Sequence, residues 1–174
     1  QNVADLKAQI AANEKGVAEL RKMVAHFGLD TVTAYMGHVQ DNAAESVRRV
    51  LERLPDTSEY AYPTDTGQTI KVKISVDREK REATVDFTGT SPVMANNVNA
   101  PEPVARAAVL YAVRVMVEDN IPMNAGCLRP INIIIPDGCM LRPQYPAAVV
   151  AGNVETSQHV TNAMFAALGS LANA

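Results

Sequence analysis

The stretch TIKVKISV, residues 69–76, alternates apolar and polar side chains along its whole length. A period of two is typical of a β-strand with one face buried and the other in solvent. A charged turn follows at residues 77–82, and Val85 and Phe87 then continue the same apolar face. We therefore predict a β-hairpin, around which a small sheet is built.

Two helices are predicted before the hairpin. In the first, one seam repeats at alternating spacings of four and three residues, and its members are Leu6, Ile10, Asn13, Val17, Leu20, Val24 and Phe27. Gly28 can adopt the left-handed conformation that ends a helix, and Asp30 is the expected N-cap of the next one. The second helix repeats the spacing and stops before Pro55. We expect residues 1–55 to form an antiparallel helical hairpin.

Further elements are predicted around the β-hairpin. Residues 55–68 are rich in Pro, Asp, Thr and Gly, and we expect a loop there. Two short apolar runs, residues 131–135 and 147–151, are predicted to be strands.

Two more helices complete the predicted fold. One covers about residues 101–118, with Asn99 as its N-cap and Glu102 as the capping-box partner. The last begins after the turn at Gly152 and Asn153. The fold class is therefore α+β: an N-terminal helical hairpin, then a small mixed sheet (the β-hairpin plus two further strands) packed with two helices. Residues 56–174 are expected to be the α+β domain.

The composition excludes several classes of protein. The chain has 174 residues, of which 47% are hydrophobic and 20% charged, and its net charge is −3. Because the balance is acidic, we predict no nucleic-acid partner. No apolar run approaches the ~18 residues of a membrane span, so we predict no membrane partner either. Without an N-terminal signal segment, we expect a cytoplasmic location.

Polar residues gather in two loops that precede helices. One loop holds Asn96, Asn97 and Asn99, and the other is the turn over residues 152–158. A helix N-terminus presents free N–H groups and the positive end of its dipole, which favours an anionic or carbonyl ligand. The alternative is ordinary helix capping by the same residue types.

Other chemistry-bearing residues are isolated. Cys127 follows Gly126 among polar residues, which fits a nucleophile, but no histidine is tied to it and a buried, inert thiol is the alternative. The three histidines have no metal-binding spacing, so we predict no metal site within the chain.

Five motifs follow one another along the chain: DLKAQIAAN at 5–13, DFTGTSP at 86–92, NVNAP at 97–101, NAGCLRP at 124–130 and AGNVETSQ at 151–158. In this order they resemble the hydantoinase B/5-oxoprolinase family, over essentially all 174 residues. The resemblance implies part of an ATP-dependent cyclic amidohydrolase, a hydrolase that opens a 5-oxoproline, hydantoin or N-methylhydantoin ring. The implied partner is an A-type subunit or domain that phosphorylates the substrate carbonyl, within a hetero-oligomer.

The resemblance also implies which parts lie elsewhere. ATP and a divalent metal are implied for the complete enzyme, but no bound cofactor is expected in this chain, which lacks the family's His- and Asp-rich metal-binding stretch. Gln1 and Ala174 both fall inside helical patterns. We therefore expect a middle-to-C-terminal fragment that is inactive by itself.

Residues at the motif positions become candidates for an active site completed by the missing portion. The candidate catalytic residues are Cys127 and Glu155, the latter as a general acid or base if burial disfavours its charged form. The candidate substrate-binding residues are Asn97, Asn99, Asn124, Arg129, Asn153, Thr156, Ser157 and Gln158. Asparagine side chains can hold a phosphorylated or tetrahedral intermediate by hydrogen bonds.

Two alternatives stay open. The chain could belong to a subunit like those of acetone or acetophenone carboxylases, which share the family's architecture. It could also be a non-catalytic assembly domain whose helical hairpin docks the partner subunit. An exposed apolar seam would favour docking, whereas Asn99, Cys127 and Glu155 in one pocket would favour catalysis.

Overall fold

A computed structural model describes residues 2–169 of the chain. It divides into two compact units, Gln1–Asp41 and Asn42–Ala174. The boundary between the units falls inside helix α2, Leu29–Leu51. The physical reason is that Ala43, Val47 and Leu51 belong to the hydrophobic core of the second unit.

The first unit holds helix α1, Asn2–Phe27, and the start of helix α2, Leu29–Leu51. The predicted break at Gly28 is confirmed, since its φ is +85° and its N–H donates to the Val24 carbonyl at 2.8 Å. Asp30 is not the N-cap, because α2 already begins at Leu29 and Asp30 lies in its first turn. Within the described residues α1 has no buried side chain, and its seam is open to solvent.

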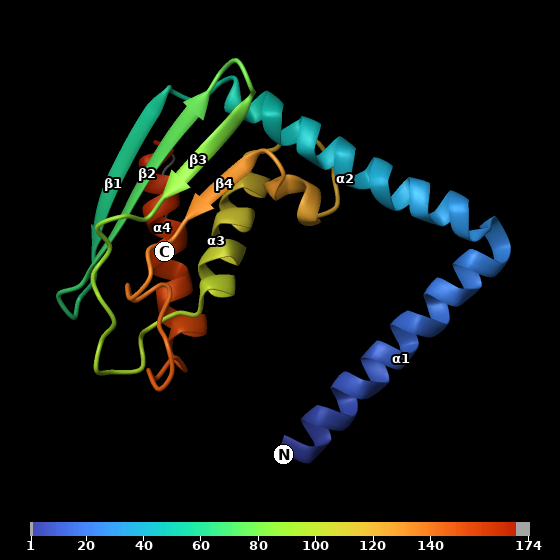
Figure 1. Ribbon diagram of the computed structural model, residues 1–174, viewed down its shortest axis with the longest axis horizontal. Helices are drawn as coiled ribbons and strands as arrows, with labels where there is room; N and C mark the ends of the chain where they lie inside the picture. The colour runs from blue at the N-terminus through green and yellow to red at the C-terminus, as the bar shows by residue number, and fades with distance from the viewer. Residues whose placement is uncertain (1, 170–174) are drawn as a thin grey trace. The chain divides into compact units, whose positions relative to one another are not determined.

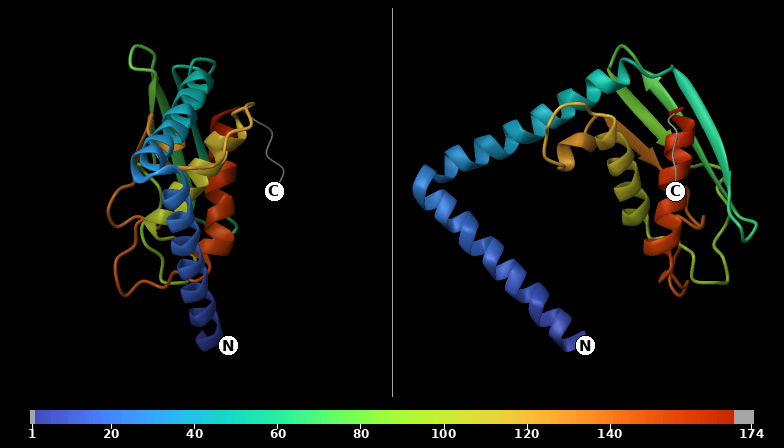
Figure 2. Two further views of the ribbon diagram at one scale, coloured as in Figure 1. Left: turned by 90° about the vertical axis from the view of Figure 1, so that its right-hand side faces the viewer. Right: turned by 180° about the vertical axis from the view of Figure 1, so that it is seen from behind.

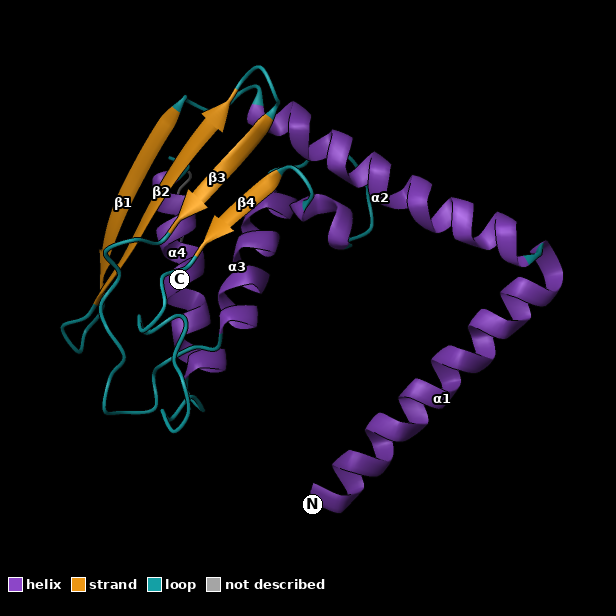
Figure 3. Cartoon of the chain, in the orientation of Figure 1, coloured by secondary structure: helices purple, strands orange, loops and turns teal. Residues whose placement is uncertain are grey.

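The second unit is built on a four-stranded mixed sheet with the order β1-β2-β3-β4 (Figures 1 and 3). The strands are β1 Thr57–Pro63, β2 Thr69–Asp77, β3 Glu82–Asp86 and β4 Ile131–Ile134. β2 pairs antiparallel with both β1 and β3, and β4 pairs in parallel with β3. The predicted hairpin is thus β2–β3, and the predicted strand at 131–135 is β4.

Strand β1 was expected to be a loop. Its sequence, TSEYAYP, is polar, ends in proline and leaves most of its residues exposed. It lies at the edge of the sheet, where proline and exposed side chains are tolerated because one side of the strand needs no partner. Its register with β2 sets Tyr62 opposite Ile70.

Helices α3, Glu102–Val115, and α4, Ser157–Ala167, cover one face of the sheet (Figure 2). α4 contacts β1 and β2, and α3 packs beside it. The Tyr62 ring on β1 stacks on His159 of α4 at 5.3 Å between centroids. The core between the layers is mostly aliphatic with one large aromatic ring, and its buried members include Ile70, Val72, Val85, Phe87, Val109, Val160 and Met164.

The predicted strand over residues 147–151 is wrong. This segment makes turns, with Ala147 N–H donating to the Gln144 carbonyl and Gly152 N–H to Val149. Val150 is 73% exposed. An apolar run this short does not specify a strand when no neighbouring strand is available to pair with it.

The capping scheme predicted for α3 is also wrong. Pro101 occupies the N-cap position, and no side chain caps the helix. The carboxylate of Glu102 instead pairs with Arg106 at 2.7 Å and with Arg142 at 3.1 Å. Asn99 does not cap α3, because its side-chain amide hydrogen-bonds to the main chain of Met94.

Ion pairs of Arg81 connect the β2–β3 turn to α2 and to the residue that follows it. Arg81 has a φ of +56° and pairs with Glu45 at 2.9 Å and Glu52 at 2.6 Å. The hydrogen bond from Arg81 lowers the pKa of Glu45 below its ordinary value of 4.5.

Candidate functional site

A groove of about 310 Å³ lies where α3 meets the start of α4. From α4 and the turn before it come Asn153, Ser157, Gln158 and Thr161. The α3 side contributes Val104, Ala107, Ala108 and Tyr111. The lining side chains are neutral, so the groove offers amide and hydroxyl hydrogen-bonding groups beside an apolar wall.

The turn that leads into the groove is a π-helix, η2, Gly152–Thr156. Such wide turns are rare and occur often at functional sites. Its central residues Asn153, Val154 and Glu155 are exposed. Ser157 Oγ donates to the Asn153 carbonyl at 2.9 Å, which joins the turn to the first residue of α4. No side chain caps α4, so capping does not explain the polar residues here.

The side chains of two expected substrate-binding residues, Asn99 and Thr156, point into the protein instead of lining the groove. Both are fully buried. The Asn99 amide hydrogen-bonds to main-chain groups, and the Thr156 hydroxyl donates to the Val98 carbonyl. Burial keeps both side chains from direct contact with a ligand in this chain.

The remaining residues near the turn are exposed. Asn97 is exposed, and its main-chain carbonyl accepts a hydrogen bond from the Ala151 N–H at 2.9 Å. That bond sets residue 97 beside the turn. Glu155 is exposed too, so in this chain the burial that a general acid or base was expected to need is absent.

Asn124, Cys127 and Arg129 belong to a different element, the 3-10 helix η1, Ala125–Leu128, and to the residues that flank it. Asn124 is the N-cap of η1, with its Oδ1 accepting from Gly126 N–H at 2.8 Å. Cys127 is a free, fully buried thiol, as the inert alternative requires. None of the three lines the groove. The structure therefore does not bring Asn99, Cys127 and Glu155 into one pocket.

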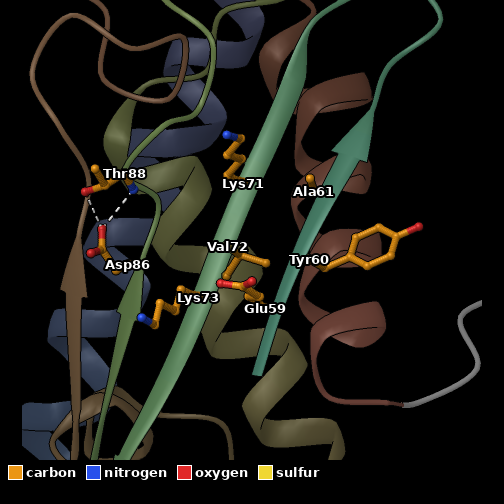
Figure 4. A pocket seen from close by; sticks show the side chains of 8 residues that line it. All are labelled: Glu59, Tyr60, Ala61, Lys71, Val72, Lys73, Asp86 and Thr88. Carbon is orange, nitrogen blue, oxygen red and sulfur yellow. Dashed lines mark hydrogen bonds between the residues drawn. The ribbon is translucent and has the colours of Figure 1, made fainter. Parts of the chain in front are cut away.

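A second hollow, about 590 Å³, lies on the sheet over β1, β2 and β3 and was not foreseen (Figure 4). Lys71 and Lys73 on β2 line it together with Glu59 and Asp86 from the neighbouring strands. The alternation that predicted β2 also predicts this outward row of lysines. Two cationic and two anionic side chains line it, so neither sign of charge is in excess.

The described residues do not fit a metal site. Among residues 2–169, no group of three or more His, Cys, Asp or Glu side chains could hold a metal ion. None of the described helices could cross a membrane.

Comparisons with known proteins agree with the sequence motifs. The family model for hydantoinase B/oxoprolinase matches residues 1–174. A 5-oxoprolinase of Dictyostelium discoideum is 42% identical over 99% of this chain, and the match covers 14% of that protein. This chain thus spans about one-seventh of the length of that relative.

Solved structures share the fold. The ATP-dependent caprolactamase of Pseudomonas jessenii matches 94% of this chain and 29% of its own, with a TM-score of 0.82 at 22% identity. A nucleotide-free acetone carboxylase matches 86% of this chain and 22% of its own, with a TM-score of 0.72 at 12% identity. At these identities the likeness concerns the fold alone. The family match over the full length and the 5-oxoprolinase relative establish that this chain belongs to the hydantoinase B/oxoprolinase family.

Proposed function

We propose that this chain is part of an enzyme that opens the ring of a cyclic amide with ATP, together with an A-type partner subunit or domain. Support comes from the family, from the 5-oxoprolinase relative and from the shared fold of an ATP-dependent caprolactamase. The substrate class proposed is the lactam or imide ring of 5-oxoproline, hydantoin or N-methylhydantoin.

The observation that carries this proposal is the chemistry of the groove between α3 and α4. Each of these rings presents at least one N–H donor and one carbonyl acceptor beside ring carbons; the hydantoins have a second carbonyl, and 5-oxoproline also has a carboxylate. Asn153 and Gln158 each offer a donor and an acceptor, and Ser157 offers a hydroxyl. Ala107 and Ala108 on α3 supply the apolar wall. Such a pairing of a few polar groups with apolar surface is typical of small-molecule sites.

Glu155 is the proposed general acid or base. It stands in the exposed turn next to Asn153, a residue of the groove wall. A carboxylate works best in proton transfer when its charged form is partly desolvated. In this proposal the burial comes from another part of the complete enzyme.

ATP and a divalent metal are proposed to bind outside residues 2–169. The described residues offer no cluster of metal ligands, so no step of the reaction is assigned to a metal here. What this chain contributes is the binding and orientation of the ring and a carboxylate beside it.

The test uses the full-length parent protein mixed with its A-type partner. ADP release is followed with 5-oxoproline, hydantoin, N-methylhydantoin, caprolactam, or acetone plus bicarbonate. Release that is coupled to ring opening is the expected result and names the ring. Turnover with acetone and bicarbonate alone would move the chain to the carboxylase alternative.

Two variants test the residues. Gln158→Ala is expected to raise KM roughly fivefold, because one hydrogen bond worth about 1 kcal/mol is lost. Gln144→Ala is the matched control, an exposed glutamine outside the groove, and should leave KM unchanged. Glu155→Gln should lower kcat at least a hundredfold by removing general acid–base catalysis. Full turnover by Glu155→Gln would refute its role.

A second role, assembly, is favoured by the exposed seam of α1. Leu6 and Ile10 are each 58% exposed and Leu20 is 44% exposed. Apolar rows of this kind mark interaction surfaces. We expect Ile10→Glu to weaken co-purification with the A-type partner, and Lys15→Glu, on the polar face, to leave it intact. Equal capture of both variants would count against this role.

A further inference from the structure

Two segments that are far apart in sequence cross at the start of the η2 turn. Residues 94–100 precede α3, and residues 148–156 precede α4. The crossing is close: a Cβ added to Gly152 would lie 2.2 Å from the Asn99 carbonyl oxygen and 2.7 Å from the Cα of Ala100. Only glycine allows the two backbones to approach so closely.

Asn99, in the first segment, stabilises the crossing by hydrogen bonds to both segments. Its Oδ1 accepts from Met94 N–H at 2.8 Å, and its Nδ2 donates to the carbonyls of Met94 and Asn96 at 3.0 and 3.1 Å. The same Nδ2 lies 3.0 Å from the carbonyl of Ala148 in the second segment. One fully buried amide therefore fixes the loop and fastens it to the other segment.

Thr156, in the second segment, also stabilises the crossing by a hydrogen bond. Its buried hydroxyl donates to the Val98 carbonyl, and Ala151, the residue directly before η2, donates its N–H to the Asn97 main-chain carbonyl. These bonds anchor η2 at both of its ends. Between the anchors, Asn153 and Glu155 are exposed.

We infer that Asn99 and Thr156 are positioning residues: they fix the η2 turn against residues 97–99, so that Asn97, Asn153 and Glu155 are held at one place. Buried polar groups with satisfied hydrogen bonds give a structure a single defined arrangement. A wide π turn with exposed polar residues would otherwise have several conformations of similar energy. The relevance to catalysis rests on the proposed function.

The test is made in the full-length protein with its A-type partner. Thr156→Val keeps the shape of the side chain but removes the donor to Val98. We expect faster amide hydrogen exchange in peptides covering residues 148–156, and kcat/KM lowered roughly tenfold, because misplacement of reacting groups is costly in rate. Thr156→Ser restores the hydroxyl and should recover both values to within about threefold of the parent.

Thr90→Val is the matched control. Thr90 is also buried, and its hydroxyl bonds to the backbone of Lys71, away from the η2 turn. This variant should lower Tm by a similar amount to Thr156→Val and change neither exchange in residues 148–156 nor kcat/KM.

The outcomes separate this inference from the proposed function. Unchanged exchange in residues 148–156 of Thr156→Val would overturn the inference, and so would equal kinetic losses in Thr156→Val and Thr90→Val. A parent enzyme silent on every cyclic amide, with faster exchange seen in Thr156→Val alone, would refute the proposed function and support the positioning of the turn.

Discussion

The first two helices carry the same kind of apolar repeat, yet only part of one contributes to a core. In α1 the seam stays open, with Ile10 at 58% exposure. In α2 the repeat is exposed at Met36 and Val39 but buried from Ala43 onward, where Val47 is fully buried. A spacing of three and four therefore specifies a helix and which residues share a face. Whether that face is covered depends on the surfaces that the rest of the fold supplies.

The largest expected effect is a difference in stability loss between alanine variants of two phenylalanines. Phe87 is fully buried at the end of the β-hairpin, whereas Phe27 at the end of α1 is 58% exposed. Phe87→Ala should lower the free energy of unfolding by about 3–5 kcal/mol, because it removes buried surface and leaves a cavity. Phe27→Ala should change it by less than about 1 kcal/mol. Urea unfolding of the 174-residue chain checks both, and equal losses would show that the two regions do not differ as described.

Replacing a glycine by alanine should change the stability in opposite directions in the two units. Gly152→Ala places a Cβ against the backbone of Asn99 and should cost about 1–3 kcal/mol. Gly16→Ala lies in the interior of α1, where nothing is within 4 Å of the added atom. It should stabilise the helix by about 0.5–1 kcal/mol, since alanine has the higher helix propensity.

Thermal unfolding of the two glycine variants shows directly whether each substitution raises or lowers Tm. A rise in Tm for Gly152→Ala would mean that the two segments do not cross closely. A fall in Tm for Gly16→Ala would mean that α1 is packed on that side.

The smallest expected effect concerns two glutamates whose pKa is lowered by basic neighbours. Arg81, distant in sequence, lowers the pKa of Glu45, whereas Lys15 and then Lys22 on the same helix lower that of Glu19. A lowered folded-state pKa contributes stability above the unfolded value, and this stability is lost as pH falls through the folded value.

Glu45→Gln should therefore cost at most about 1 kcal/mol at pH 7, because the pair is partly exposed and screened. The difference from the parent should vanish once the pH falls below the lowered pKa of Glu45. Glu19→Gln should leave global unfolding unchanged at every pH, since its partners lie on its own helix. Denaturant titrations at pH 7 and pH 3 measure both, and a pH-independent loss in Glu45→Gln would contradict this account.

Local patterns predicted the elements that are specified by near neighbours. The alternation at residues 69–76 gave β2, and Gly28 gave the break between α1 and α2. Strand β1 was missed because an edge strand needs little apolar alternation, and its pairing partner, Thr69–Asp77, makes it a strand. Residues 147–151 were predicted as a strand for the opposite reason, since they are apolar but have no strand to pair with.

In the candidate site, too, some features follow from the local sequence and others depend on contacts between distant segments. The motif at residues 151–158 led to Asn153, Ser157 and Gln158, which the structure brings together in the groove. It could not show that Thr156 and Asn99 face inward, because that depends on two loops separated by about fifty residues. Tyr111 and Thr161 were not predicted as groove residues, and their helical spacing gave no signal beyond a packed face.

The sequence by itself determined the helices, the β-hairpin, the α+β class and the family, because short-range periodicity, turn residues and ordered motifs are local properties of the chain. The tertiary structure alone decided which apolar face is covered, that β1 completes the sheet, and which polar residues of one motif point outward and which are buried. Those outcomes depend on contacts between distant segments, where a buried polar group must find its hydrogen-bond partner and an apolar face must find another to pack against.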